Sequence, residues 1–232
     1  MKTREGTRGM LTGRRRRGSA RALTRRALSR RRSGTTRDES VAPGPAPRRP
    51  ARQRVVLRPP DASDRDELLR LARASRGLHR RWVDPPADAS TFRSFLQGSR
   101  LASVRTFLVI RRADRAIVGV FTLSQIFLGN FRSAYLGYWV GAPYSGQGYM
   151  TEGMALLLRY AFGRLKLHRV EANLQPRNVA SRALARRTGF RQEGFSPRYL
   201  KIGGRWRDHE RWAITVEDFR SSTRRRRRPS GR

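Results

Sequence analysis

Two glycines, Gly146 and Gly148, follow an aromatic segment in the stretch GYWVGAPYSGQGYMTEG, residues 137–153. The aromatic residues predict a strand, and the apolar periodicity after Gly148 predicts a helix, so the glycines lie in a strand-to-helix loop. Glycines let successive backbone N–H groups approach an anion, and the helix dipole favours negative charge at the same place. The chemistry that this pattern indicates is phosphate binding.

Two common phosphate-binding motifs do not match this loop. A dinucleotide fingerprint needs a third glycine where Thr151 stands, and a P-loop needs Gly-Lys-Ser/Thr where the chain has Gly148, Tyr149 and Met150. A general anion site therefore remains, and a tight strand-to-helix connection that binds nothing is the alternative.

The elements that position the loop follow from the periodicity of apolar residues. We predict a helix over 61–77, a hairpin around a polar turn at 112–115, and a strand over 134–140 that leads into the loop. The next helix covers 151–162 and is followed by a strand over 168–174, which makes a right-handed βαβ unit with one parallel pair. Hairpins followed by one crossover predict an α+β fold with a mixed sheet.

Composition limits the class of protein. The chain has 232 residues, a formal net charge of +36 and no Cys. It therefore has room for one sizeable domain with tails, and it contains no disulfide, thiolate zinc site or cysteine nucleophile. No apolar run approaches the length of a membrane span. We expect a cytoplasmic protein with no metal site and no membrane contact.

Much of the positive charge lies at the two ends of the chain. Residues 1–54 contain 18 Lys or Arg and 3 acids, and residues 224–232 contain 6 Arg. Because few large apolar residues accompany these charges, we predict a disordered Arg/Pro-rich extension over 1–54, a globular domain over 55–221 and a disordered basic tail over 222–232. An organellar transit peptide and a misassigned start codon stay open as alternative explanations of the extension.

Four motifs in sequence order resemble the GCN5-related N-acetyltransferase (GNAT) superfamily, and within it the ribosomal-protein-alanine N-acetyltransferases of the RimJ type. They are the glycine loop and the segments PRNVAS, GFRQEG and YLKIGGRWRDH, and the resemblance covers about residues 55–218. It implies a GNAT fold, which is a mixed, mostly antiparallel sheet of about six or seven strands with flanking helices, splayed at an acetyl-CoA cleft.

The resemblance also implies that the bound phosphate belongs to acetyl-CoA, which acts as co-substrate. Loop amides would bind its pyrophosphate, and they belong to Ser145, Gly146, Gln147, Gly148, Tyr149 and Met150. Ser145 stands where the superfamily has Arg or Gln, which removes a side-chain contact but no backbone donor. Backbone groups of the preceding strand would bind the pantetheine arm and the thioester oxygen, and they belong to Tyr138, Trp139 and Val140.

Asn178 and Ser181 match the family's P-x-N-x-x-S motif. Asn178 is expected to cap a helix, to lie beside the coenzyme, or to do both. Ser181 is either a surface serine or the proton donor to the leaving thiolate.

The acceptor amine must be neutral to attack a thioester. An α-amine has a pKa of about 8, so a weak base or a chain of waters is sufficient at neutral pH. Glu171 and Tyr199 are our candidate catalytic residues on the acceptor side, with His168 and Glu193 as comparable candidates. His209 is expected to be structural. Large aromatic residues line either the acceptor side or the core, and they are Trp82, Phe131 and Tyr135.

The leading hypothesis is therefore an acetyl-CoA-dependent enzyme that acetylates the N-terminal alanine of a ribosomal protein. Two alternatives stay open: an acetyltransferase for lysine or a small amine, and an assembly factor that binds RNA or the ribosome through its basic ends. Basic runs without interleaved aromatic residues indicate nonspecific attraction to RNA phosphates.

Overall fold

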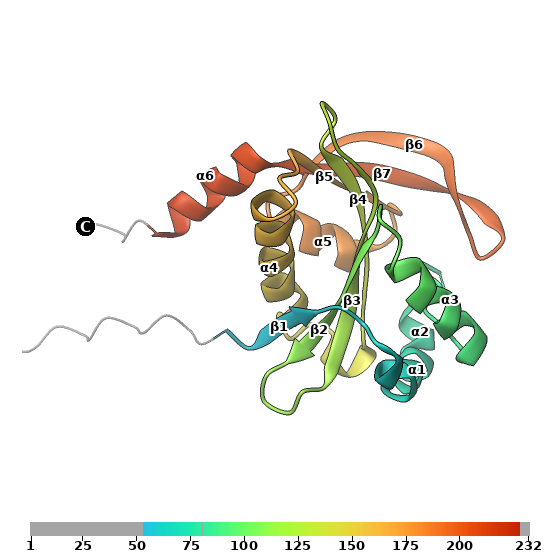
Figure 1. Ribbon diagram of the computed structural model, residues 1–232. Coiled ribbons are helices and arrows are strands. Elements are labelled where there is room, and N and C mark those ends of the chain that lie inside the picture. Colours follow the sequence, from blue (N-terminus) through green and yellow to red (C-terminus); the bar gives the residue numbers. More distant parts are fainter. Residues whose placement is uncertain (1–52, 80, 228–232) are drawn as a thin grey trace, which may run out of the picture. The chain divides into compact units, whose positions relative to one another are not determined.

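The computed structural model describes residues 53–79 and 81–227 (Figure 1). The extension predicted over 1–52 and the end of the predicted tail at 228–232 lie outside the described residues. Their predicted disorder and RNA contacts therefore stay predictions.

A 7-stranded sheet forms the centre of the described chain, in the order β1-β2-β3-β4-β5-β7-β6. The strands are β1 (Val55–Arg58), β2 (Arg105–Arg111), β3 (Ile117–Phe127), β4 (Ser133–Val140), β5 (Arg169–Leu174), β6 (Arg191–Ile202) and β7 (Arg205–Thr215). Only the β4–β5 pair is parallel, and the other neighbouring strands are antiparallel. The predicted α+β class with a mixed, mostly antiparallel sheet is confirmed.

Helices cover both faces of this sheet (Figure 1). The α-helices are α1 (Arg65–Ala74), α2 (Arg76–His79), α3 (Ala89–Ser99), α4 (Tyr149–Gly163), α5 (Val179–Arg187) and α6 (Val216–Arg227), and two short 3₁₀ helices are η1 (Ala62–Asp64) and η2 (Ala142–Tyr144). Asp61 begins η1 with a capping box, because its side chain accepts from the Ser63 amide and the Asp64 side chain accepts from the Asp61 amide.

Two apolar clusters pack on opposite faces of the sheet. Val109 of β2 belongs to the cluster with α4 and α5, whereas its neighbours Leu108 and Ile110 belong to the cluster with α1 and α3. Successive side chains of a strand point to opposite faces, so β2 separates the two cores. We call these the α4 face and the α1 face.

β4 and β5 pair over only three residues, from Ser133↔Arg169 to Tyr135↔Glu171. Beyond that pair β4 continues to Val140 and β5 to Leu174 without further pairing between them. The strands therefore separate after Tyr135 and Glu171, as the predicted splay requires. We call this place the β4–β5 splay.

The predicted domain limits differ from the structure at both ends. Arg54, assigned to the extension, forms an ion pair with Glu152 of α4 and so belongs to the domain. At the other end α6 continues to Arg227, so the backbone of residues 222–227 is helical where a disordered tail was predicted.

β6 forms one edge of the sheet and is irregular. Its pairing with β7 shifts register between Gln192 and Gly194 and again between Ser196 and Leu200. The second irregularity contains Pro197, which has no N–H to donate, and Arg198, whose φ is 47°.

Candidate active site

The glycine loop (residues 145–148) joins η2 to α4 and has a conformation that requires glycine. Gly146 and Gly148 have φ values of +75° and +81°, and Gly148 is the N-cap of α4. The amides of Gly146, Gln147 and Gly148 donate to no group within the described part of the chain. The first N–H groups of α4, which begins at Tyr149, also lack partners within the helix. Several N–H donors are therefore available at the positive end of α4.

Ser145 differs from the other predicted loop residues. Its amide donates to the Ala142 carbonyl at 3.2 Å, because η2 ends there. The Ser145 amide, which the resemblance assigns to the pyrophosphate, therefore already has a partner among the described residues. The donors that remain begin at Gly146.

Arg54 ties the start of β1 to this loop. Its guanidinium contacts the Glu152 carboxylate at 3.2 Å, and its Nη2 donates to the Gln147 carbonyl, also at 3.2 Å. The backbone amides of Arg54 and Val55 also donate to Glu152. Glu152 is therefore neutralised in part, although it lies in the first turn of α4, beside the predicted anion site.

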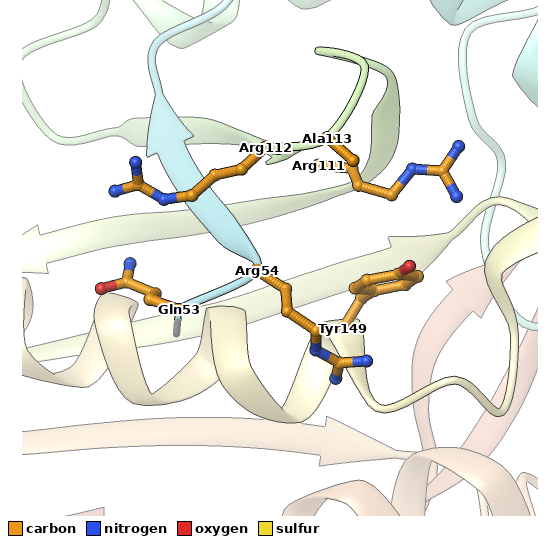
Figure 2. Close-up of a pocket in the computed structure, with 6 residues that line it drawn as sticks. All are labelled: Gln53, Arg54, Arg111, Arg112, Ala113 and Tyr149. Atoms are coloured by element: carbon orange, nitrogen blue, oxygen red, sulfur yellow. The ribbon is translucent and has the colours of Figure 1, made fainter. Parts of the chain in front are cut away.

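An open pocket of about 690 Å³ lies beside the first residue of α4 (Figure 2). Three guanidinium groups line it, from Arg54, Arg111 and Arg112, together with Gln53, Ala113 and Tyr149. The Arg54 guanidinium lies 4.7 Å from the centre of the Tyr149 ring. Arg111 pairs with Asp114 and lowers the pKa of that carboxyl to about 2. The pocket therefore carries positive potential next to the glycine loop.

The backbone of β4 presents alternate residues to the splay. Because the Gly141 amide donates to Val118 of β3, alternation along the antiparallel ladder directs Trp139 to β3 as well, whereas Tyr138 and Val140 point away from β3. Trp139, predicted to offer backbone groups to the ligand, instead uses them within the sheet. Its side chain is buried against His79, with ring centres 5.6 Å apart.

His79, at the end of α2, already bonds one of the predicted groups on β4. Its Nε2 lies 2.6 Å from the Val140 carbonyl oxygen, which only accepts, so Nε2 carries the proton. Burial lowers the pKa of His79, so the ring is neutral near pH 7. Two residues further on, the Arg81 carbonyl accepts from the Gln175 side chain at 3.1 Å. The end of α2 therefore contacts both sides of the splay.

The first turn of α5 is tied to β4 on the α4 face. The Tyr138 hydroxyl donates to the Ser181 carbonyl at 3.2 Å, and burial raises the pKa of Tyr138 to about 12. The Asn178 side chain accepts from the Ser181 amide at 3.1 Å, which confirms its predicted capping role. The Ser181 hydroxyl itself bonds to no group in the described residues, so it is free to act on a ligand.

Sequence analysis missed a buried carboxylate that holds α5 in place. Glu210 of β7 is only 6% exposed and accepts from Arg182 of α5 and from the Trp212 indole, each at 2.9 Å. Arg182 also donates to the Pro176 carbonyl at 3.3 Å. These bonds join β7, α5 and the loop before α5. The residues lie far apart in sequence, which left no local pattern to find.

On the α1 face, the structure brings together several of the predicted acceptor-side residues. Tyr135 pairs with Glu171 across the parallel ladder, and burial and the Tyr199 hydroxyl raise the pKa of Tyr135. The Tyr199 ring lies 6.2 Å from the ring of His209. His209 is buried, and its Nδ1 lies 2.9 Å from the Arg207 carbonyl oxygen. Tyr135, Glu171, Tyr199 and His209 therefore form one group.

The two candidate carboxylates of this region are not free. Glu171 accepts from Arg169 at 2.8 Å, and Glu193 is paired with the same guanidinium. The hydrogen bond from Arg169 lowers the pKa of Glu193 below its usual range, which makes it a weaker base. Arg169 therefore engages both carboxylates.

Other candidates lie apart from this group. His168 pairs with Glu217 of α6 at 3.3 Å, and both side chains are exposed. Phe131 is 63% exposed at the turn between β3 and β4 and packs on Phe127. Trp82 follows α2, where its amide donates to the His79 carbonyl. None of the three joins the Tyr135 group within the described residues.

In the part of the chain that the structure describes, no cluster of three or more His, Cys, Asp or Glu side chains has the arrangement of a metal site. Among the described helices, none combines the length and the apolar character that a membrane span requires.

Comparison with known proteins defines the class. The family model for the acetyltransferase (GNAT) domain matches residues 54–191, which is more than half of the chain. The chain therefore belongs to the GNAT acetyltransferase domain family, and the resemblance predicted from the four motifs is confirmed.

The relatives include acetyltransferases named for ribosomal proteins. The chain is 39% identical over 106 residues to the [ribosomal protein uS5]-alanine N-acetyltransferase of Escherichia coli, and the match covers 46% of this chain and 55% of that protein. It is 38% identical over 112 residues to a Bacillus subtilis protein named "Probable N-acetyltransferase YjcK", covering 48% of this chain and 62% of the relative. The matches thus span less than two thirds of either relative.

A solved structure is similar over a longer region. Mycobacterium smegmatis RimJ in complex with CoA-disulfide aligns with a TM-score of 0.66 and 32% sequence identity, covering 71% of this chain and 83% of that one.

Proposed function

We propose that the chain is an acetyl-CoA-dependent N-acetyltransferase that acetylates the N-terminal α-amine, typically of alanine, of a ribosomal protein. Membership of the GNAT family supports acetyl transfer, and the names of the relatives support the acceptor. Acetyl-CoA would supply the activated acetyl group as a thioester. The remaining question is whether this chain has the groups that would hold the coenzyme.

The glycine loop is the observation that carries the proposal. The amides of Gly146, Gln147 and Gly148 have no other partner among the described residues, and all three residues are exposed, so a ligand can reach these donors. Oxygens of a pyrophosphate would accept from them at the positive end of α4. Arg54 and Arg111 add positive charge nearby. The donor set therefore fits a phosphate ester.

The residues of the β4–β5 splay would serve the thioester end of the coenzyme. Backbone groups of Tyr138 and the amide of Val140 point into the splay, where they would bond the pantetheine arm and the thioester oxygen. The free hydroxyl of Ser181 would donate a proton to the leaving thiolate. Asn178 would hold Ser181 in position by capping the first turn of α5.

The proton of the acceptor amine needs only a weak base. Glu171 is paired with Arg169, and Tyr199 lies among Tyr135 and His209. We propose Glu171 and Tyr199 as the ends of a short path to solvent for this proton. Because an α-amine has a pKa of about 8, the rate should rise with pH up to that value.

The test begins with acetyl-CoA binding to the full chain. A ligand that binds only the folded state at 100 times its Kd stabilises that state by about 2.7 kcal/mol, so the melting temperature should rise. An unchanged melting temperature and no heat of binding would contradict the proposal.

The acceptor is then identified by intact mass. Ribosomal proteins from a strain that lacks the gene should include one that has lost a single acetyl group at its N-terminus. Loss of acetyl groups from lysines or small amines would instead support the alternative acceptors. Normal acetylation with defective ribosome assembly would support the assembly-factor hypothesis.

A further inference from the structure

One buried polar atom on β5 has no hydrogen-bond partner. The side-chain oxygen Oδ1 of Asn173 is shielded from solvent and accepts no hydrogen bond from any residue that the structure describes. Buried carbonyl oxygens are nearly always paired, and an unpaired one destabilises the fold. An unpaired atom of this kind requires an explanation, and a ligand that supplies the missing donor is one.

Asn173 lies just past the point where β4 and β5 separate. The last pair of the parallel ladder is Tyr135↔Glu171, and Asn173 is two residues further along β5. Continuing the same register would put Asn173 level with Gly137, next to Tyr138. Tyr138 is the residue whose backbone we assign to the thioester oxygen, so Asn173 lies near the expected place of reaction.

The side chain of Asn173 lies on the α1 face of the sheet. Its neighbours Ala172 and Leu174 belong to the core on the α4 face, so alternation directs Asn173 to the other side. Gln175 has the same parity and contacts the Arg81 carbonyl after α2. Asn173 therefore shares its face with Glu171 and the other proposed acceptor-side residues.

The chemistry of Oδ1 limits the ligand. A carbonyl oxygen accepts an N–H, and because it is neutral it does not favour an ammonium over an amine as strongly as a carboxylate would. A neutral amine has two N–H bonds and one lone pair. Holding one N–H leaves the lone pair free to point at the acetyl carbon.

From these observations we propose that Asn173 Oδ1 accepts an N–H of the acceptor α-amine and orients its lone pair for attack. The inference rests on the proposed function. In the transfer, the amine nitrogen bonds to the acetyl carbon, the carbon–sulfur bond breaks, and the amine gives up one proton to water. Coenzyme A leaves as a thiolate that takes a proton from water or from Ser181, and water then returns the proton to the Ser181 oxygen.

The charged groups around Asn173 come from β5 and β7, and the segment after α2 adds an uncharged carbonyl. On β5, Arg169 and Glu171 form an ion pair. Across the ladder on β7, Arg211 stands opposite Asn173, with His209 two residues before it. Arg81, after α2, contacts this face through its carbonyl. A new charge at position 173 would therefore meet a mainly basic environment.

The first test replaces the amide with an apolar group of similar shape. In the full chain, Asn173→Leu should lower kcat/KM for an N-terminal alanine peptide about tenfold, because the amine loses one hydrogen bond. Calorimetric affinity for acetyl-CoA should not change. The free energy of unfolding of the ligand-free chain should stay the same or rise, because an unpaired buried oxygen is gone.

A matched control replaces an exposed amide side chain with Leu elsewhere. Gln192 is an exposed amide on β6 with no side-chain hydrogen bond to the described residues, so Gln192→Leu should leave kcat/KM and coenzyme affinity unchanged.

A second variant gives a readout that a purely structural role would not move. Asn173→Asp puts a carboxylate beside the amine, which favours the ammonium form and raises the apparent pKa of the bound amine. The rise of kcat/KM with pH should therefore shift to higher pH than in the wild-type enzyme. Gln192→Asp should leave the profile in place.

Three results would overturn the inference. Wild-type kcat/KM and an unshifted pH profile in both Asn173 variants would show that Oδ1 does not contact the amine. A loss of acetyl-CoA affinity with unchanged peptide kinetics would assign Oδ1 to the coenzyme. A wild-type enzyme that binds acetyl-CoA but leaves peptides and other amines unmodified would remove the proposed function, and this inference with it.

Discussion

The two sides of the β4–β5 splay are built in different ways. The β4 side, with the glycine loop, offers mainly backbone groups that belong to one short stretch, residues 138–150. The β5 side offers side chains from four elements, among them Asn173, Ser181, Tyr199 and Glu210. Backbone groups suit a ligand part that never changes, whereas side chains permit a different acceptor on the same fold.

The largest effect should come from the buried carboxylate on the β5 side. Glu210→Ala removes the acceptor of Arg182 and of the Trp212 indole, and it leaves a partly buried guanidinium unpaired. The free energy of unfolding should fall by about 2–4 kcal/mol in urea titrations. The control Glu217→Ala removes an exposed pair with His168 and should change the free energy of unfolding by less than about 0.5 kcal/mol. Equal losses of stability in Glu210→Ala and Glu217→Ala would contradict the larger contribution expected of the buried carboxylate.

The next effect concerns the β4 side and affects binding more than stability. Gly148→Val forces a β-branched residue into a φ of +81° and brings a Cβ to 3.3 Å from Arg54. The free chain can relieve this strain of about 2 kcal/mol by moving the loop, and because binding must restore the loop, acetyl-CoA affinity should fall about 30-fold in calorimetry. Gly98→Val, where a Cβ would meet nothing within 4 Å, is the control. Wild-type affinity in Gly148→Val would rule out the loop as the pyrophosphate site.

A smaller effect should separate chemistry from binding on the β5 side. Ser181→Ala removes a hydroxyl that has no other partner in the described residues. We expect kcat to fall about tenfold, which is less than the roughly hundredfold or larger loss usual for a general acid, because water can also protonate the leaving thiolate; acetyl-CoA affinity should change little. Ser94→Ala on the exposed surface of α3 should change neither. An unchanged kcat would remove Ser181 from the mechanism.

The smallest effect is a pH dependence of stability. Burial lowers the pKa of His79 and of His209 in the folded state, so the unfolded chain binds more protons below about pH 6.5. Their contribution is present above that pH and is lost as the pH falls toward 5. The free energy of unfolding should therefore decrease between pH 7.5 and 5, and His209→Gln should flatten the curve. A curve that is equally steep in the variant would show that other groups cause the slope.

The difference between a site built from one short stretch and a site built from distant elements also explains what the sequence could predict. The glycine loop, the cap at Asn178 and the mixed sheet were predictable because each depends on residues close in sequence. The contact between Arg54 and Glu152 joins residues 98 positions apart, so Arg54 was assigned to the extension. The tertiary fold alone determines the contacts of His79 and Glu210. It also determines that the side-chain oxygen of Asn173 has no partner among the described residues.

Two contacts within the predicted site involve residues close in sequence. Arg169 and Glu171 are two residues apart on one strand, so they point to the same face and form an ion pair that was readable from the spacing. The Pro143 turn before the loop, which forms η2, engages the Ser145 amide. To predict the partner of the Ser145 amide, the type of turn must be known, and the residue pattern alone did not specify it.

The irregular edge of the sheet bears on self-association. A long regular edge strand exposes N–H and C=O groups on which a second chain can add a strand, and this leads to fibrils and other aggregates. β6 interrupts that row with two register shifts, with Pro197 and with the positive φ of Arg198, and its charged residues add repulsion between copies. Strand addition at this edge is therefore disfavoured, so the 12 residues of β6 can extend past the splay without becoming a template for aggregation.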